Sequence, residues 1–439
     1  MNVVLQGAFW LALYLALVLG PLAVLILAPS PGGAGFWWDF AMGMGFAGLV
    51  MMGIQFLLTA RFRRATAPCG IDLVYYVHRY LAYALVGVVL AHAVIPMVIN
   101  PALRSAFVPF TVSWPMTAGS ASLLCLLALV VSSAGRKRLR IPYEAWRVAH
   151  LALGVAAVAL AFVHMISVGH YTATPVVRAL WLGIGLSLLG IVLWLRVIRP
   201  WRLLRTPYRV TEVRPELGSS WTVVLEPVGH DGFAFEPGQF AWVTIGRSPF
   251  AMQEHPFSIA SAPAPGGRLE FTIKELGDFT QTVGRIPVGE RAYVDGPYGA
   301  FSIDRQPDAA GYVFIGGGIG IAPMTSMLRA LAGRGDRRPH LLFAAHSRWD
   351  RVPLRDEVRA LAEQLDLKRI HVLEEPPEDW SGERGRIDAD ILERHLPDDR
   401  GNFHYFVCGP VPMIRAVERL LVDAGVPRSR IHTELFDLA

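Results

Sequence analysis

The first 200 residues contain six long hydrophobic runs separated by short polar segments. A hydrocarbon core of roughly 30 Å takes about 20 helical residues to cross, and each run is close to or above that length. The pattern therefore predicts six membrane-spanning helices. The runs lie near residues 8–29, 38–60, 75–99, 116–133, 145–168 and 176–198.

The pattern changes after residue 205. Short runs rich in β-branched and aromatic residues, such as "WTVVLEPV", "QFAWVTI" and "RLEFTIKEL", alternate with Gly and Pro turns, which is typical of a small antiparallel barrel. From about residue 311, strands such as "GYVFIGG" and "FHYFVCGP" alternate with helical stretches, which indicates a doubly wound α/β fold with a parallel sheet. We therefore expect an all-α six-helix membrane domain (1–204), an antiparallel β-barrel (205–307) and an α/β nucleotide-binding domain (308–439).

Charge divides the chain in the same way. Residues 1–200 hold thirteen of the 41 basic residues and only three of the 36 acidic ones. The basic residues of this half gather in short segments at 61–68, 135–140 and 196–205, after the second, fourth and sixth runs. The positive-inside rule then places the N-terminus and everything after residue 200 in the cytoplasm. A basic excess confined to loops beside apolar runs does not indicate nucleic-acid binding; the expected surroundings are membrane lipid.

Two of the hydrophobic runs share a histidine spacing. His78 and His92 are the first and last residues of "HRYLAYALVGVVLAH", and His150 and His164 are those of "HLALGVAAVALAFVH". Fourteen helical residues turn through about 1400°, some 40° short of four turns, and rise about 21 Å, so each pair shares one helix face near opposite membrane edges. The two helices run in the same direction. We therefore expect His78 to face His150 and His92 to face His164.

Facing imidazoles in a membrane usually have a function, because such residues are costly in lipid. Zinc would require its ligands in one small shell, often with acids or thiolates, and these pairs lie far apart. Iron in a b-type haem takes one imidazole above and one below its plane, so two haems fit better. Arg79 and Arg147 lie at the inner ends of these helices, either beside the haem propionates or as ordinary interface arginines. The three cysteines are too few and too scattered for a disulfide framework or a four-cysteine cluster.

Glycines mark a candidate phosphate site in the last domain. The turn "GGGIGIAP" (316–323) follows a strand and opens a helix, where backbone N–H groups can bind a pyrophosphate. "FVCGPVPMI" (406–414) provides a second strand end at the same expected edge. Taken alone, Cys408 also fits a small buried core residue.

Five motifs occur together in one order: "HPFSIAS" (255–261), "GDFT" (277–280), "DGPYG" (295–299), "GGGIGIAP" and "CGP". With four membrane histidines in front, the chain resembles the NADPH oxidase and ferric reductase superfamily in its short bacterial form, with a ferredoxin–NADP reductase-like module. The resemblance implies cytoplasmic NADPH passing hydride to FAD, and single electrons crossing through two haems to dioxygen or a ferric chelate.

Residue roles follow from the same resemblance. The flavin would be lined by His255, Pro256, Phe257, Ser258 and Ile259, with Ser258 near its N5 atom. Thr280 would help to hold the FAD pyrophosphate, and Phe436 would cover the flavin, although it also fits a hydrophobic tail packed on the barrel. The NADPH pyrophosphate would lie on Gly316, Gly317, Gly318, Gly320 and Pro323, and the nicotinamide beside Cys408, Gly409 and Pro410.

The cosubstrate and the acceptor are less closely specified. Ser347 and Arg348 follow a strand where a 2′-phosphate should lie, which favours NADPH and leaves NADH possible. Eukaryotic oxidases of this superfamily usually keep extra basic or histidine side chains beside the outer haem, whereas Pro96 stands one turn after His92 in this chain. His170 and Arg178 of the outer loop are the candidates to take the place of those side chains. Electron donation to quinone or to a partner protein, or a proton-relaying transporter, are the alternatives, although the sequence requires no partner protein.

Overall fold

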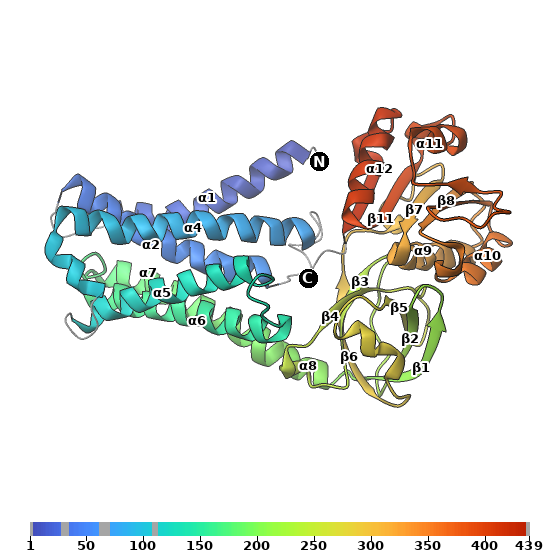
Figure 1. The fold of residues 1–439 in the computed structure, drawn as a ribbon. Coiled ribbons are helices and arrows are strands. Elements are labelled where there is room, and N and C mark those ends of the chain that lie inside the picture. The colour runs from blue at the N-terminus through green and yellow to red at the C-terminus, as the bar shows by residue number, and fades with distance from the viewer. Residues whose placement is uncertain (1–2, 28–34, 61–70, 108–112, 436–439) are drawn as a thin grey trace. The chain divides into compact units, whose positions relative to one another are not determined.

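The computed structural model describes residues 3–27, 35–60, 71–107 and 113–435. The chain forms two compact units, one of which includes Leu73–Arg199 and the other the chain from Pro200 onward. The first unit consists of helices, and the second contains both β-sheets (Figure 1).

Among the described residues, six helices are long and apolar enough to cross a membrane, which confirms the six predicted spans. They are α1 (Val3–Leu27), α2 (Phe36–Thr59), α4 (Ile71–Ile99), α5 (Trp114–Gly135), α6 (Tyr143–Val168) and α7 (Pro175–Leu193). A helix pairs most of its backbone groups within its own segment, as lipid requires. The chain is therefore a multi-pass membrane protein.

The last span extends further than the hydrophobic run predicts. After α7 the helix continues through one π-helical turn (Trp194–Ile198) into α8 (Arg199–Leu204). Pro200 has no N–H for the usual i→i−4 bond, and a locally widened turn is a known way to accommodate a proline inside a helix. The basic segment after the sixth run is thus helical.

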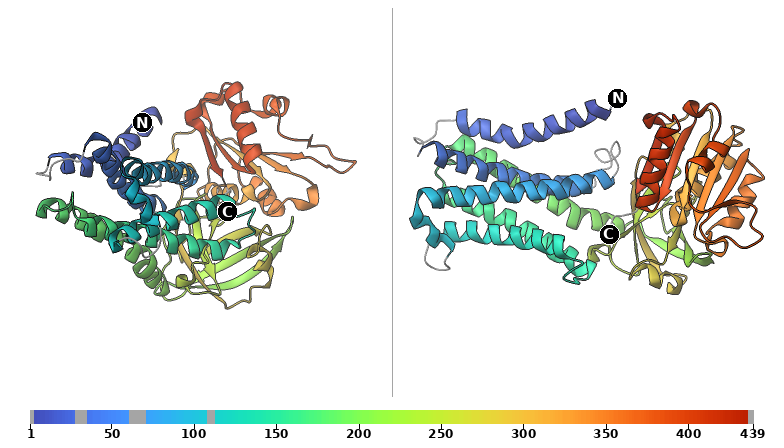
Figure 2. Two further views of the ribbon diagram at one scale, coloured as in Figure 1. Left: turned by 60° about the vertical axis from the view of Figure 1, so that its left-hand side comes forward. Right: turned by 45° about the horizontal axis from the view of Figure 1, so that its top comes forward.

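The membrane unit has its own core. Leu49, Met52, Leu85, Leu126 and Trp181 are all buried there. Helices α5 and α6 lie side by side in all the views (Figures 1 and 2). The buried Ser122 hydroxyl on α5 donates to the Ala157 carbonyl on α6 at 2.7 Å, a polar contact of the kind that joins helices in lipid.

The second unit starts with a six-stranded antiparallel sheet in the order β4-β3-β6-β1-β2-β5. Its strands are β1 (Tyr208–Glu216), β2 (Ser220–Pro227), β3 (Phe240–Ile245), β4 (His255–Ser258), β5 (Leu269–Lys274) and β6 (Arg291–Tyr298). Ile259, directly after β4, forms an antiparallel bridge to Phe271 of β5, so the two edge strands meet. The sheet is curled and antiparallel, as predicted for the barrel.

A parallel six-stranded sheet follows, in the order β10-β9-β8-β7-β11-β12. Its strands are β7 (Tyr312–Gly317), β8 (His340–His346), β9 (Leu367–Leu373), β10 (Glu383–Arg384), β11 (His404–Gly409) and β12 (Ile431–Leu435). Its helices are α9 (Ile321–Gly333), α10 (Arg355–Ala362), α11 (Ala389–His395) and α12 (Val411–Asp423). The order confirms the doubly wound α/β fold. Strands β8, β9 and β10 are added on one side of β7, and β11 and β12 on the other side, so the strand order reverses between β7 and β11. Ligands bind at this point in such folds.

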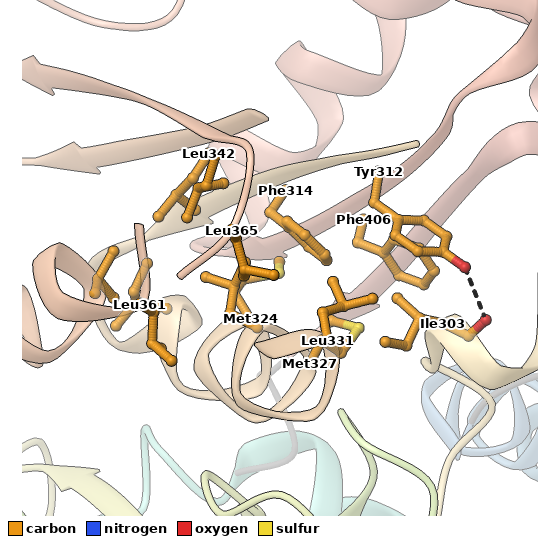
Figure 3. Packing of buried hydrophobic residues seen from close by; sticks show 14 of the residues in the cluster. Ile303, Tyr312, Phe314, Met324, Met327, Leu331, Leu342, Leu361, Leu365 and Phe406 are labelled. Carbon is orange, nitrogen blue, oxygen red and sulfur yellow. Dashed lines mark hydrogen bonds between the residues drawn. The ribbon is translucent and has the colours of Figure 1, made fainter. Parts of the chain in front are cut away.

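Separate hydrophobic clusters cover the two faces of the parallel sheet. Helices α9 and α10 contribute to one, and α11 and α12 to the other. Figure 3 shows Met324, Met327 and Leu331 of α9 packed toward Phe314 and Phe406 of the central strands. This packing fixes the start of α9 against the carboxyl end of β7.

Candidate functional site

The structure brings the four membrane histidines together as two pairs, each formed by α4 and α6. The ring centres of His78 and His150 are 6.3 Å apart, with 50° between the ring planes. Those of His92 and His164 are also 6.3 Å apart, with 68° between the planes. The 14-residue spacing on each helix thus gives two matching sites, one toward each end of the bundle.

This separation suits one metal ion between two imidazoles. An imidazole nitrogen lies about 1.1 Å from its ring centre and a metal–imidazole bond is about 2.0 Å, so ring centres on opposite sides of one ion are about 6.2 Å apart. The rings are too far apart to be in van der Waals contact face to face. The donor set and its spacing therefore fit iron of a b-type haem with two axial histidines.

Backbone carbonyls orient both rings of the outer pair. The Nδ1 atom of His92 lies 2.9 Å from the Ala41 carbonyl on α2, and that of His164 lies 2.8 Å from the Pro115 carbonyl on α5. A carbonyl can only accept, so Nδ1 carries the proton in both rings. The lone pair is then on Nε2, the nitrogen left for a metal.

Glycines make these contacts possible. A Cβ atom on Gly45 would lie 2.6 Å from Nδ1 of His92, and one on Gly119 would lie 2.9 Å from Nδ1 of His164. Both distances are below ordinary van der Waals separation. Each outer histidine is therefore seated on a glycine one turn after the carbonyl that binds it.

The inner pair differs, because a side-chain hydroxyl replaces the carbonyl. Nδ1 of His150 lies 3.0 Å from the Ser133 hydroxyl on α5, which also lies 2.6 Å from the Leu129 carbonyl and 3.3 Å from the Trp146 indole nitrogen. Nδ1 of His78 is buried, and in the described part of the chain it has no hydrogen-bond partner.

The predicted arginines and the outer-loop residues lie near the helix ends. Arg79 follows His78 on α4 and is exposed, and Arg147 lies one turn before His150 on α6 and is half-buried. His170 is exposed and packs edge-on against Tyr171, whose hydroxyl donates to Asp39 at 2.6 Å. Pro96 lies inside α4 and Arg178 is exposed on α7.

The predicted flavin strand is β4 with the residues just after it. Ser258 ends the strand and is 6% exposed, and its hydroxyl has no partner among the described residues. His255 stacks on Phe279 with ring centres 4.1 Å apart and planes 10° apart, while Pro256 pairs with Trp242 of β3. A buried hydroxyl left unbonded by the protein fits a polar ligand such as a flavin ring.

Three other residues predicted to bind FAD make contacts with the rest of the protein. Phe257 packs on Phe279 at 6.2 Å, and Ile259 is fully buried in the barrel core. The Thr280 hydroxyl accepts from the N–H groups of Leu276 and Gly277, both at 2.8 Å, and donates to the Gly277 carbonyl at 3.1 Å. Thr280 thus holds its own turn together.

Two separate stretches converge at the carboxyl edge of the parallel sheet. Gly316 of β7 and Cys408 of β11 are register partners. A Cβ atom on Gly320 would lie 2.2 Å from the Cys408 carbonyl oxygen, so only glycine allows the turn to approach β11 this closely. Gly318 has a φ of +55° and no neighbour within 4 Å of its Cβ position, which leaves the tip of the turn open at the start of α9.

The remaining predicted residues of this edge lie around the same turn. A Cβ atom on Gly317 would lie 2.5 Å from the Met413 sulfur and 3.0 Å from Pro410. Gly409 ends β11, and Pro323 is buried in the first turn of α9. Cys408 is fully buried behind them. The structure thus gathers the predicted dinucleotide residues at the point where the strand order reverses.

The residues expected beside the 2′-phosphate follow β8. Ser347 is half-buried, and its carbonyl accepts from the N–H of Glu375 at 2.8 Å. Arg348 is exposed and donates to both carboxylate oxygens of Asp350, each at 3.0 Å. Its positive charge is therefore already paired. The predicted Phe436 lies outside the described residues.

Several residues of these sites gave no motif in the sequence. They are Ala41 and Pro115, whose carbonyls accept from the outer histidines, the glycines Gly45 and Gly119, Ser133, and Met413. A carbonyl contact leaves no trace in residue type. For Gly45 and Gly119 the available signal is a small residue inside a membrane helix, which allows close approach of a neighbouring helix.

Three protein families match consecutive parts of the chain. Residues 44–161 match the family described as ferric reductase like transmembrane component, residues 227–302 an FAD-binding domain, and residues 314–419 an oxidoreductase NAD-binding domain. The first match includes three of the four paired histidines and stops three residues before the fourth, His164. The chain therefore contains FAD-binding and NAD(P)H-binding domains behind a ferric-reductase-like membrane domain.

Curated relatives match about half of the chain. The chain is 32% identical over 238 residues to the reductase component of propane 2-monooxygenase from Rhodococcus jostii, covering 52% of this chain and 62% of that protein. It is 32% identical over 240 residues to ferredoxin–NADP reductase B from Sorangium cellulosum, covering 52% of this chain and 96% of that protein. The chain thus spans somewhat less than two thirds of the first of these relatives and nearly all of the second.

A solved ferredoxin reductase in carbazole 1,9a-dioxygenase has 25% identity and a TM-score of 0.47, covering 53% of this chain and 69% of that one. The curated relatives and the three domain matches together identify the family. The chain belongs to the ferredoxin–NADP reductase-like flavoproteins. With its ferric-reductase-like membrane domain, it has the architecture of the ferric reductase and NADPH oxidase superfamily, that of a transmembrane electron-transfer oxidoreductase.

Proposed function

We propose that the protein carries electrons from cytoplasmic NADPH across a bacterial inner membrane to dioxygen on the outer side. One NADPH provides two electrons and a proton, and two dioxygen molecules each take one electron to become superoxide. The observation that carries this proposal is the pair of matching histidine sites, each with ring centres 6.3 Å apart, on helices joined to an FAD and NAD(P)H module.

Two b-type haems and FAD are the cofactors. When bound, FAD accepts a hydride and releases its electrons singly, and haem iron passes electrons one at a time. His78 and His150 would hold the inner haem, and His92 and His164 the outer haem. The contacts of His92 and His164 with backbone carbonyls support this role, because they fix the tautomer that leaves Nε2 for the iron.

The residues of the soluble module have matching roles. Ser258 would hydrogen-bond the flavin near N5, since its buried hydroxyl has no partner among the described residues. The open turn at Gly318 and the start of α9 would bind the pyrophosphate of the dinucleotide. Cys408 would border the nicotinamide, Phe436 would cover the flavin, and Arg79 and Arg147 would approach the inner haem propionates.

Charge supports the proposed orientation. The basic segments at 135–140 and 196–205 follow α5 and α7, and the positive-inside rule puts such segments in the cytoplasm. The soluble unit, which begins at Pro200, would then lie on the same side as cellular NADPH. The outer histidine pair would lie nearest the external acceptor.

Difference spectra of the detergent-purified protein test this proposal. We expect two b-type haems per chain after dithionite, and the same bands with NADPH as the only reductant under argon. His92→Ala or His164→Ala should remove one haem's absorbance, and retention of both would contradict the ligand assignment. Admission of air should then give superoxide. A protein that stays reduced in air but is oxidised by a ferric chelate would instead be a ferric reductase, and one oxidised only by quinone an electron donor to the quinone pool.

A further inference from the structure

In the part of the chain that the structure describes, one side-chain hydroxyl bonds to the inner histidine pair. Nδ1 of His150 lies 3.0 Å from the Ser133 hydroxyl on α5, and Nδ1 of His78 is buried without a hydrogen-bond partner among the described residues. In the outer pair, both Nδ1 atoms have a backbone carbonyl as their partner. The orientation of the inner pair therefore depends on the identity of a side chain, whereas that of the outer pair depends on the backbone.

The hydrogen bonds of Ser133 determine which atoms carry the protons. A hydroxyl has one proton to donate and two lone pairs that can accept. The proton goes to the Leu129 carbonyl at 2.6 Å, because a carbonyl oxygen can only accept. The indole N–H of Trp146 can only donate, and it occupies one lone pair at 3.3 Å. The remaining lone pair accepts from His150, so Nδ1 of this ring carries a proton and the ring's own lone pair is on Nε2.

Trp146 also contacts the histidine ring directly. The two ring centres are 5.0 Å apart, with 50° between the planes. The Arg136 guanidinium, directly after α5, lies 5.8 Å from the centre of the Trp146 ring, and the Tyr143 ring centre lies 5.7 Å from it. Cation–π and aromatic contacts of this kind stabilise a particular placement of an indole. Trp146 is thus held where its N–H meets the Ser133 oxygen.

The neighbouring Ser132 shows what a serine does here without an imidazole. Its hydroxyl donates to the same Leu129 carbonyl at 3.1 Å, a common local bond of a serine inside a helix. Ser133 makes that local bond as well, but it also bonds to an indole and to an imidazole of the next helix. The additional contacts distinguish Ser133 from an ordinary helix serine.

We propose that Ser133 and Trp146 are the positioning residues of His150. Ser133 accepts the Nδ1 proton, and Trp146 limits the strength of that bond by donating to the same oxygen. The inference rests on the proposed function, in which His150 holds the inner haem.

The two residues should act on this haem in opposite directions. An acceptor on Nδ1–H makes an imidazole a stronger donor through Nε2, and a stronger donor favours ferric iron, which has the greater positive charge. Loss of the Ser133 hydroxyl should therefore raise the midpoint potential. Loss of the Trp146 N–H removes a competing donor, strengthens the bond from Ser133 to His150 and should lower the potential.

Matched substitutions in the full-length protein test the inference. Ser133→Ala removes the hydroxyl, Ser133→Thr keeps it, and Trp146→Phe removes the N–H but keeps an aromatic ring beside His150. Ser132→Ala is the control, because it removes the adjacent hydroxyl that bonds to the same carbonyl. The readouts are the midpoint potential of each haem by spectroelectrochemical titration and the transfer of haem to excess apomyoglobin.

We expect Ser133→Ala to weaken the retention of one haem by about 10- to 100-fold, as for other partners of metal-bound histidines, and to raise its potential. A loss of about 10-fold confined to the ferric form is equivalent to a rise of about 59 mV for one electron. Trp146→Phe should lower the potential of the same haem. Ser133→Thr and Ser132→Ala should match the unchanged protein.

Unchanged potentials in Ser133→Ala, or shifts of the same sign in Ser133→Ala and Trp146→Phe, would overturn the inference. So would a Ser133→Thr or a Ser132→Ala protein as defective as Ser133→Ala, because the loss would then not depend on the hydroxyl at this position. Absence of haem from the unchanged protein would instead overturn the proposed function on which the inference rests.

Discussion

The Arg329 guanidinium on α9 donates to the Ala260 carbonyl, directly behind the predicted flavin strand, at 3.0 Å. The same guanidinium pairs with Glu270 of β5 at 2.9 Å and with Glu357 of α10. Its side chain is 18% exposed. One largely buried cation thus joins the antiparallel barrel to the helix that follows the glycine turn.

Replacement of Arg329 by methionine should therefore loosen this junction. Removing one partner from a buried ion pair leaves uncompensated charge and costs about 3–5 kcal/mol; partial exposure here reduces the expected loss in unfolding free energy to roughly 2 kcal/mol. We expect FAD release at a lower temperature in a thermal ramp followed by flavin fluorescence. Arg359→Met is the control, because its partner Asp356 is 66% exposed. Equal melting of the two variants would contradict the prediction.

The glycines that pack against the outer histidines give a second prediction. Gly45→Ala and Gly119→Ala would each place a methyl group within 3 Å of a histidine Nδ1, at 2.6 and 2.9 Å. The ring or the helix must then move, and the carbonyl contact that orients the ring is lost. We expect either variant to lose most of one haem's absorbance while flavin content stays unchanged.

Gly43→Ala is the matched control for these two substitutions. It lies on α2 two residues before Gly45, and no atom lies within 4 Å of its Cβ position. Alanine also favours a helix more than glycine does. The haem spectrum of this variant should equal that of the unchanged protein. Loss of haem in all three variants would point to a general effect on the bundle.

The membrane histidines show which part of the site the sequence predicts. The 14-residue spacing and the shared direction of the two helices predicted which rings face each other, because both follow from helix geometry along a single segment. The carbonyls that orient His92 and His164 come from residues 51 and 49 positions away, and a carbonyl is common to all residue types. No sequence pattern distinguishes Ala41 or Pro115 from their neighbours.

In the chain after residue 205, too, local features could be predicted and long-range contacts could not. Individual strands and the glycine turn follow from local composition, so the antiparallel barrel and the parallel sheet could both be predicted. The bridge from Ile259 to Phe271 and the approach of Gly320 to Cys408 depend on long-range register. Arg348 illustrates the limit: it has the residue type expected at a phosphate site, but only the structure reveals its pairing with Asp350.

Acid should destabilise the soluble unit. Burial lowers the pKa of His346 to about 4, with further lowering by the neighbouring His371 and Lys274. Burial also lowers the pKa of His371 to about 4, with Arg369 and Arg355 adding to the effect. In the unfolded chain both histidines regain their ordinary pKa of 6.5 and bind protons that the folded state excludes.

The unfolding free energy should therefore be unaffected by these groups above pH 6.5 and fall as the pH drops from 6.5 toward 4. We expect the temperature of FAD release to decline across this window. His346→Gln, which cannot take up a proton, should reduce the slope without changing its sign. A slope identical to that of the unchanged protein would show that His346 does not contribute to it.

Cosubstrate choice gives the last prediction. Arg348 and Asp350 form a two-bond pair with side chains 49% and 62% exposed, so breaking it costs only about 0–1 kcal/mol. Arg348 can then turn to a 2′-phosphate, but Asp350 stays nearby and repels that dianion. A carboxylate in this region of the fold also suits the free ribose hydroxyl of NADH. We therefore expect Asp350 to limit the preference for NADPH.

Asp350→Asn should raise kcat/KM for NADPH by about 5- to 10-fold, equivalent to roughly 1 kcal/mol, and leave that for NADH equal or lower. Arg348→Ala should lower the NADPH value and spare NADH. The measurement is the rate of flavin reduction under argon over a range of each dinucleotide. Asp356→Asn, an equal charge change on an exposed part of α10, controls for long-range electrostatics. If both aspartate variants favour NADPH equally, the effect is one of net charge, and Asp350 does not select the cosubstrate.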